Sequence, residues 1–345
     1  METRPVIGIT MGDPAGGGPE LTVKALRRKE LYQRCRPLVV ADAAMIEDAI
    51  GMVGAQELSV RRVSRVEEAR FEYGVIDVYH MDLIDPAKFA YGKVSAMCGE
   101  AAFQCVRKVI ELAMEGQVDA TVTNALNKEA MNLAGHHFSG HTEIYAHYTN
   151  TPKYTMMLAH EDLRVVHVST HVSLREACDR VKKDRVLDVI RIAHQACRSL
   201  GIEQPRIGVA GLNPHAGENG MFGTEEIEEI APAIAQARQE GMQVEGPIPP
   251  DSLFSKARGG WYDIVVAMYH DQGHIPLKVV GFVYDRQAGK WSSVSGVNVT
   301  LGLPIIRTSV DHGTAFDQAG KGIQNETSLV NAIDYAIRMA LHRQA

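Results

Sequence analysis

Short apolar runs alternate with longer amphipathic patterns along most of the chain. The runs contain β-branched residues and end at glycine, proline or polar residues, which is typical of buried strands. The predicted strands lie within the segments 5–11, 37–42, 74–80, 118–124, 154–160, 162–170, 205–215, 262–270 and 303–309. Apolar positions at helical spacing predict helices at 19–28, 95–116, 184–200 and 224–240. Alternation of strands and helices predicts an α/β fold with a largely parallel sheet.

Composition limits the class of protein without identifying it. The 345 residues, with 45% hydrophobic and 23% charged side chains, are sufficient for about two domains of ordinary size. The net charge is −6 and no lysine or arginine block occurs, which argues against nucleic-acid binding. No apolar run reaches about 18 residues, so no membrane partner is expected. Five scattered cysteines without CxxC spacing, and no export signal, predict reduced thiols and a cytoplasmic location.

Three histidines lie shortly after predicted strands. They are His171, His215 and His270. Ligands bind at the carboxyl ends of the strands in an open α/β sheet, so these imidazoles can converge there although they are far apart in sequence. Three imidazole ligands would suit a divalent transition metal and leave a position for substrate. The alternative is that each histidine is a polar loop residue without chemistry.

The pair His270 and His274 has the HxxxH spacing of a helical zinc site. Gly273 and Pro276 lie within or beside this segment and oppose a helix there. We therefore expect His274 to be structural or to support a ligating neighbour. No G-x-S-x-G motif occurs, so a serine–histidine triad is not favoured.

Other polar segments could bind an anion. His141, Thr142 and Glu143 follow a glycine at a predicted helix start, where backbone N–H groups favour negative charge. Capping of this helix by Ser139 or Thr142 explains the segment equally well. Arg307 at the end of its predicted strand, and Lys278, are candidate carboxylate or phosphate ligands or surface ion-pair partners.

Several motifs in this order resemble the 4-hydroxythreonine-4-phosphate dehydrogenase family over nearly the whole chain. They are ITMGDPAGGGPE, LNKEA, SGHTE, STHVSLREA, GLNPHAGENGMFG, PPDSLF, AMYHDQGHIPLK and VNVTLGLPIIRTSVDHGTAFDQAGKG. The resemblance implies an isocitrate/isopropylmalate dehydrogenase-like fold with two α/β/α domains and a cleft between them. The first domain is expected at 1–135 plus 300–345. The second, with the metal and dimer contacts, is expected at 136–299.

The resemblance also implies the roles of particular residues. A divalent metal (Zn, Co, Mg or Mn) is expected at histidines shared across a homodimer, and NAD is the expected second cofactor. The implied metal ligands are His171, His215 and His270. The implied substrate contacts are His141, Thr142, Lys278, Asn298 and Arg307. The expected cofactor contacts are His312, Gly313 and Asp317. The expected catalytic groups are Lys278, Asp251 and Asp271, where either aspartate acts as acid–base or supports a neighbouring group.

Two departures from the family pattern bear on the substrate. Gly17 replaces a larger residue, and the segment 283–295 is longer than in the biosynthetic enzymes. The sequence of residues 71–103 more closely resembles a catabolic subgroup that acts on 4-phosphorylated threonate or erythronate. We therefore expect NAD-dependent oxidation of the 3-hydroxyl of 4-phospho-D-threonate or D-erythronate 4-phosphate, with decarboxylation to dihydroxyacetone phosphate.

Four alternatives stay open. The first is the 4-hydroxy-L-threonine 4-phosphate dehydrogenase of pyridoxal phosphate biosynthesis, and the second is a terephthalate cis-dihydrodiol dehydrogenase. The third is a metal-assisted phosphatase. The fourth, a metal-dependent sugar-acid binding protein, would catalyse nothing.

Overall fold

The computed structural model describes residues 4–286, 290–294 and 296–343 and divides the chain into two compact units. The first unit comprises Met1–Thr151 and Leu303–Ala345, and the second comprises Pro152–Gly302. The change of unit therefore follows residue 151 instead of the expected residue 135. Residues 136–151, with His141, lie in the first unit.

The strands of the first unit are parallel to one another. Their spatial order is β3 (Ser59–Val63), β4 (Val75–His80), β2 (Arg36–Ala41), β1 (Val6–Thr10), β5 (Ala120–Thr123) and β14 (Arg307–Val310). The central strands β1 and β5 are entirely buried, which explains why their sequences are almost continuously apolar. Only β14 comes from the C-terminal part of the chain, and it brings Arg307 opposite Thr121.

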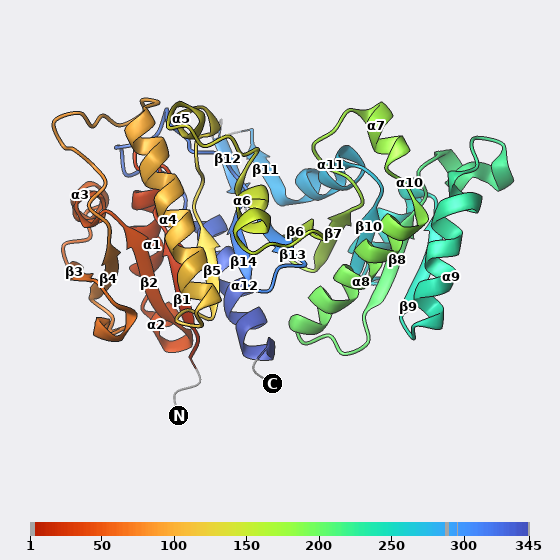
Figure 1. Ribbon diagram of the computed structural model, residues 1–345, viewed down its shortest axis with the longest axis horizontal. Helices are drawn as coiled ribbons and strands as arrows, with labels where there is room; N and C mark the ends of the chain where they lie inside the picture. The colour runs from red at the N-terminus through yellow and green to blue at the C-terminus, as the bar shows by residue number, and fades with distance from the viewer. Residues whose placement is uncertain (1–3, 287–289, 295, 344–345) are drawn as a thin grey trace. The chain divides into compact units, whose positions relative to one another are not determined.

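Helices cover this sheet in two groups (Figure 1). On one side, α1 (Gly18–Leu26) contacts both α3 (Ala43–Val53) and α12 (Thr327–Arg343). Those that contact α4 (Ala96–Met114) are α5 (Lys128–Leu133) and α6 (His141–Tyr148). The first unit also contains α2 (Lys29–Arg34) and the 3₁₀ turn η1 (Val66–Glu68). Ser95 begins α4 by accepting a hydrogen bond from the Cys98 N–H, as a serine N-cap does.

The strands of the second unit are partly antiparallel. Their order is β13 (Val297–Leu301), β6 (Thr155–His160), β7 (Leu163–His167), β10 (Ile264–Ala267), β8 (Arg206–Ala210) and β9 (Gln243–Ile248). The last four are parallel, whereas β6 is antiparallel to both of its neighbours. A separate antiparallel pair, β11 (Phe282–Asp285) and β12 (Lys290–Val294), occupies the expected long loop. Residues 287–289 and 295 of that loop lie outside the described residues.

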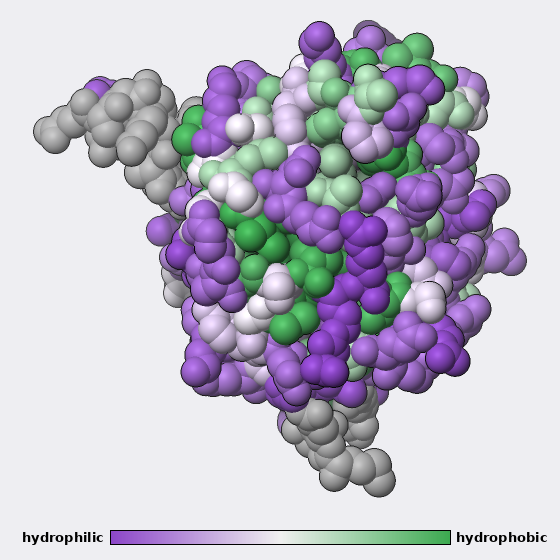
Figure 2. Space-filling view, turned by 90° about the vertical axis from the view of Figure 1, so that its left-hand side faces the viewer, coloured by the Kyte–Doolittle hydropathy of each residue, from purple (hydrophilic) through white to green (hydrophobic). Residues whose placement is uncertain are grey.

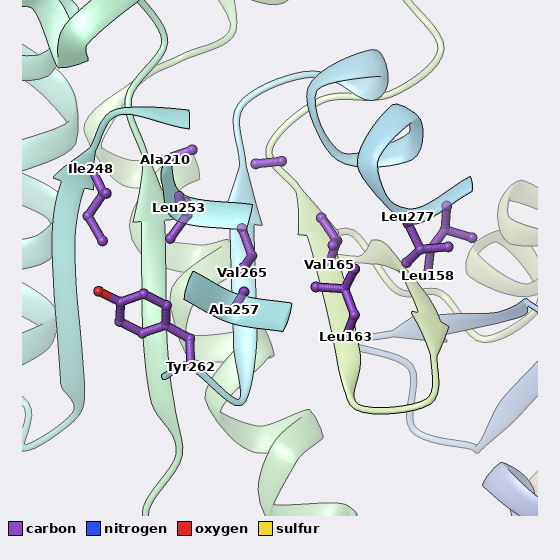
Figure 3. Packing of buried hydrophobic residues seen from close by; sticks show 11 residues of the cluster. Leu158, Leu163, Val165, Ala210, Ile248, Leu253, Ala257, Tyr262, Val265 and Leu277 are labelled. Carbon is purple, nitrogen blue, oxygen red and sulfur yellow. The ribbon is translucent and has the colours of Figure 1, made fainter. Parts of the chain in front are cut away.

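Helices cover both faces of the β7–β9 sheet as well. The helices are α7 (Leu174–Asp179), α8 (Lys183–Ser199), the π-helical η3 (Glu226–Ile230), α9 (Ala231–Gln239), α10 (Pro250–Arg258) and α11 (His270–Gly281), with the turn η2 (Pro214–Gly220). Figure 3 shows Leu253 of α10 and Leu277 of α11 packing with the strands in one hydrophobic cluster. On α8, Cys197 is completely buried.

The predicted helix break after His270 is wrong, because α11 runs through Gly273 and Pro276. Gly273 serves close packing instead. A Cβ there would lie 2.4 Å from His167 Nε2 and 2.6 Å from Val165 Cγ1. The predicted strand 303–309 is also shifted, since β14 begins only at Arg307. Arg307 is therefore the first residue of the strand and is not at its end.

On the face shown in Figure 2, hydrophilic residues surround a smaller group of hydrophobic ones. Within the described ranges, no helix is both long and apolar enough to cross a membrane.

Two glycine-to-alanine substitutions separate packing from helix propensity. Gly51, in α3, has nothing within 4 Å of an added Cβ. Gly51→Ala should stabilise the protein by about 0.5–1 kcal/mol. Gly273→Ala should destabilise it by about 1–3 kcal/mol, because the added methyl overlaps His167 and Val165. Urea denaturation measures both. A Gly273→Ala protein as stable as the wild type would contradict the packing role of Gly273.

Candidate active site

A cluster of histidines lies in the second unit, where β7 and β10 end. The rings of His270 and His274 stack with their centres 3.6 Å apart, one helical turn apart on α11. The His171 ring centre lies 6.0 Å from that of His270, and the His167 ring centre lies 4.7 Å from that of His274. HxxxH spacing on a helix thus does bring two imidazoles together here.

Parallel pairing of β7 with β10 produces this convergence. Ala267 pairs with His167, and the Val168 N–H then donates to the Ala267 carbonyl. The chain leaves β7 beside the segment that starts α11, so His171 and His270 reach the same region. The sequence did not indicate a role for Gln272, which links the segments after β10 and β8. Its side chain accepts from the Met268 N–H and donates to the Gly211 carbonyl.

The inner histidines are neutral at physiological pH. Burial lowers the pKa of His167 to about 3, and repulsion from His274 when that ring is also protonated is the next cause. Burial also lowers the pKa of His274 to about 4, and the nearby His270 acts in the same direction. A neutral imidazole with an available nitrogen is the form that ligates a metal.

Asp271 orients the outer histidine. Its Oδ1 lies 2.6 Å from His270 Nδ1, which leaves Nε2 directed elsewhere. A carboxylate on one ring nitrogen is the common arrangement around metal-ligating histidines, where it fixes the tautomer. The contact of Asp271 with His270 is compatible with a supporting role, which stays a prediction.

The surface beside this cluster is hollowed. A cavity of about 630 Å³ is lined by Thr170, His171, Val172, Ser173, Leu174, Glu176, Ala177, Tyr269, His270 and Asp271. It is large enough for a small polar ligand. Asp251, at the start of α10, is exposed, does not line this cavity, and accepts a hydrogen bond from the Ser252 N–H.

His215 lies apart from the other histidines on the turn after β8. Its backbone, with those of the following residues to Asn219, is left-handed, with φ between 41° and 80°. Among these residues only Gly217 adopts such a φ without steric cost. Each of the others costs about 1–2 kcal/mol. The exposed His215 ring contacts Phe222, with 6.3 Å between ring centres.

The histidines fit a metal in part. Nowhere in the described chain do three or more His, Cys, Asp or Glu side chains form a group that could hold a metal. His171 and His270 supply two imidazoles close together, one of them held by a carboxylate, whereas His215 does not join them. A complete histidine set would therefore need His215 from another chain or a movement of its turn.

A second polar group lies in the first unit around Arg307. Its side chain is only 3% exposed and donates from Nη2 to Thr123 Oγ1 at 2.9 Å. The guanidinium lies 5.7 Å from the centre of the Tyr145 ring, and Tyr145 donates to Thr121 Oγ1. Burial lowers the pKa of Arg307 to about 10, so it remains cationic.

His141 lies at the start of α6 beside this cation. Burial, followed by the charge of Arg307, lowers its pKa well below the usual value, so the imidazole is neutral. Its Nε2 is buried without a hydrogen-bond partner among the described residues. The charge of Arg307, the helix start and the available Nε2 fit an anionic ligand such as a carboxylate or phosphate. Thr142 follows in the first turn of α6.

Two further predicted substrate contacts lie in the second unit. Lys278, on α11, is half-buried with its Nζ 5.2 Å from the centre of the Phe282 ring. Asn298, on β13, has a buried Oδ1 without a hydrogen-bond partner among the described residues, and its amide contacts the Met156 sulfur.

The predicted cofactor loop, 311–322, is anchored to the glycine-rich loop after β1 and to the first turn of α1. The Gly17 N–H donates to the Thr314 carbonyl at 3.0 Å, and the Gly320 N–H donates to Glu20 Oε1 at 2.6 Å. His312, Gly313 and Asp317 lie on the part of the loop that is half-buried or exposed. They are therefore accessible to a ligand.

Comparison with known proteins identifies the family. Residues 33–336 match the model of the pyridoxal phosphate biosynthetic protein PdxA. The D-threonate 4-phosphate dehydrogenase of Cupriavidus necator is 48% identical over 98% of both chains. The chain belongs to the PdxA family.

Two solved structures of different specificity are also similar. A 4-hydroxythreonine-4-phosphate dehydrogenase from Burkholderia phymatum superposes with a TM-score of 0.84 at 46% identity, covering 97% of this chain and 98% of that one. A terephthalate 1,2-cis-dihydrodiol dehydrogenase from Burkholderia xenovorans gives a TM-score of 0.68 at 30% identity, covering 97% and 98%. These likenesses confirm the expected fold class, and the dehydrogenase names of the relatives argue against a binding protein or a phosphatase.

The glycine that departs from the PdxA-family pattern has a steric explanation. A Cβ on Gly17 would lie 1.8 Å from Gln324 Oε1, so the Gln324 side chain occupies the space that a larger residue would need. Gln324 also holds α1, because its carbonyl accepts from Lys24 Nζ.

Asp13, in the same glycine-rich loop, should make the stability of the folded protein depend on pH. Burial raises its pKa from 3.8 to about 6, although its Oδ1 accepts from the Ala15 N–H. A raised carboxyl pKa means that the folded state binds its proton more tightly. The stability from Asp13 is therefore complete below pH 3.8 and is lost as the pH rises through about 6.

Asp13→Asn should consequently stabilise the protein at pH 8, by up to about 3 kcal/mol, because it removes the cost of a buried charge while keeping the acceptor for Ala15. The gain should shrink as the pH falls towards 4. Denaturant titrations at a series of pH values measure this. A gain that does not depend on pH would show that Asp13 is not the titrating group.

Proposed function

We propose that this chain is an NAD-dependent, metal-dependent dehydrogenase that oxidises 4-phospho-D-threonate or D-erythronate 4-phosphate at the 3-hydroxyl. The resulting β-keto acid loses CO₂ to give dihydroxyacetone phosphate, and the hydride reduces NAD to NADH. The observation that carries the proposal is the buried Arg307 beside the neutral His141 at a helix start, in a chain so similar to a D-threonate 4-phosphate dehydrogenase.

The described side chains support separate tasks. Arg307 and the Nε2 of His141 bind an anionic group of the substrate, and Lys278 supplies a further cation. Asp271 holds His270 in one tautomer through Nδ1. A divalent metal bound to His171, His215 and His270 would lower the pKa of the reacting hydroxyl as a Lewis acid. His312, Gly313 and Asp317 are the proposed contacts of NAD.

The substrate decides between this proposal and its two dehydrogenase rivals. 4-Phospho-D-threonate and 4-hydroxythreonine phosphate share the carboxylate, the 3-hydroxyl and the phosphate, but differ at C2. An unmatched buried polar group at C2 costs about 1–3 kcal/mol, or roughly 5- to 150-fold in kcat/KM. NADH formation with each substrate, and a coupled assay for dihydroxyacetone phosphate, should show a higher kcat/KM for 4-phospho-D-threonate or D-erythronate 4-phosphate.

A tenfold preference for the amino substrate would instead support the biosynthetic role in vitamin B6 formation. If the protein oxidises only a cyclic dihydrodiol, the proposal that its substrate carries a phosphate is wrong. NADH without dihydroxyacetone phosphate would remove the decarboxylation.

Subunit mixing tests the proposed homodimer and its shared site. His171 and His270 lie together within one chain, so His215 is the ligand for the partner to supply. His215→Ala and His270→Ala proteins, each inactive, should regain activity when subunits exchange, because a hybrid dimer contains one intact set. The matched control mixes His171→Ala with His270→Ala, which should stay inactive. Recovery in the control alone would place His171 and His270 on opposite chains.

A further inference from the structure

We propose that Glu226 is a positioning residue that holds the left-handed turn carrying His215 in the conformation that can ligate a metal. The inference rests on the proposed function, because that proposal makes His215 a ligand. Glu226 is absent from the residues that the sequence points to, and it contacts no predicted site residue directly. It acts through the backbone of the segment that leads to His215.

The turn that carries His215 is strained along most of its length. Its non-glycine residues His215, Ala216, Glu218 and Asn219 all have positive φ. Its own backbone hydrogen bonds include those from the Ala216 N–H to the Asn213 carbonyl and from the Phe222 N–H to the Gly217 carbonyl. A run of strained residues persists only where surrounding contacts over-determine it, and such runs concentrate at functional sites.

Glu226 supplies those contacts from inside the protein. Its side chain is 3% exposed. Oε1 accepts from the backbone N–H groups of Leu212 and Asn213, at 2.8 and 2.7 Å. Oε2 accepts from Asn213 Nδ2 at 3.0 Å. These are the residues that lead from β8 into the turn, so one carboxylate fixes the direction in which the chain approaches His215.

Two glycines allow the carboxylate to come so close. A Cβ on Gly211 would lie 3.2 Å from Glu226 Oε1, and a Cβ on Gly217 would lie 2.7 Å from Oε2. Glu226 also begins the π-helical turn Glu226–Ile230, an irregularity that is frequent at functional sites. The turn, the glycines and the π-helical segment therefore form one arrangement around a single buried carboxylate.

The adjacent Glu225 provides a matched control. Its Oε2 accepts from Asn213 Nδ2 at 2.7 Å, and it makes none of the backbone contacts of Glu226. Glu226→Gln changes a carboxylate that accepts from the backbone N–H groups of Leu212 and Asn213. Glu225→Gln makes the same chemical change in a carboxylate that accepts from the Asn213 side chain and from N–H groups of Thr224 and Glu225 on its own segment. The two variants carry the same substitution at adjacent positions, and only Glu226 contacts the backbone that leads into the turn.

The experiment uses full-length, metal-stripped protein and Co²⁺ as the probe. Cobalt affinity and the visible absorption of bound cobalt are measured for wild type, Glu225→Gln and Glu226→Gln. Amide hydrogen exchange of residues 212–223 is followed in the same proteins without metal. Glu226→Gln should lose roughly 10- to 100-fold in cobalt affinity, with an altered cobalt spectrum and faster exchange confined to 212–223. Glu225→Gln should stay close to wild type in all three.

A double variant tests the strain directly and guards against a simple folding defect. Ala216 has φ 52°, a conformation that glycine adopts without the same steric cost. Glu226→Gln/Ala216→Gly should therefore recover part of the lost cobalt affinity. Recovery supports the proposal even where Glu226→Gln alone folds poorly.

The remaining outcomes are distinguishable. Wild-type affinity and wild-type exchange in Glu226→Gln would overturn the positioning role. Equal losses in both single variants would also overturn it, since they would indicate a general effect of charge. A wild type that binds no Co²⁺ would contradict the proposed metal, while the exchange measurement would still decide whether Glu226 holds the turn.

Discussion

The parallel pairing of β7, β10 and β8 is the constraint on which the candidate metal site depends. It places the loops after three strands at one edge of a sheet, so residues about a hundred positions apart come within contact distance. His171 and His270 are brought together in this way, and the Gln272 side chain joins the starts of the α11 and His215 segments. The chemistry of the second unit therefore follows from strand order, because no single segment of sequence contains it.

Burial decides the charge state of the groups at both polar clusters. It keeps His167 and His274 neutral, so these rings add no positive charge beside the proposed ligand His270, and it keeps His141 neutral beside a cationic Arg307. A neutral imidazole next to a guanidinium avoids repulsion between two cations and can still donate a hydrogen bond to an anion. The same desolvation raises the pKa of Asp13, where it weakens the fold at neutral pH. Desolvation thus favours the proposed binding groups and opposes stability in a nearby loop.

The sequence predicts the central strands well because they are buried on both faces and therefore read as continuous apolar runs. It misses β3 and β9, which lie at sheet edges and carry polar residues such as Arg61 and Glu245. It also misses β13, although most of that strand is buried. The histidines after β7 and β10 were predictable from their positions relative to strands. The helix at His270 was not, because Gly273 is selected by the approach of His167, which only the tertiary structure shows. Glu226 has no signal in one sequence, since a glutamate on a polar helix is ordinarily exposed.

The central claim is that His171 and His270 of one chain bind the same divalent metal, with Asp271 holding the second imidazole. Anomalous X-ray diffraction at the zinc absorption edge, from crystals of the Zn²⁺-loaded protein, tests it most directly. The account predicts one strong peak about 2.0–2.1 Å from a ring nitrogen of each histidine. A peak that involves only one of the two histidines, or a zinc position bound by other residues, would contradict the account.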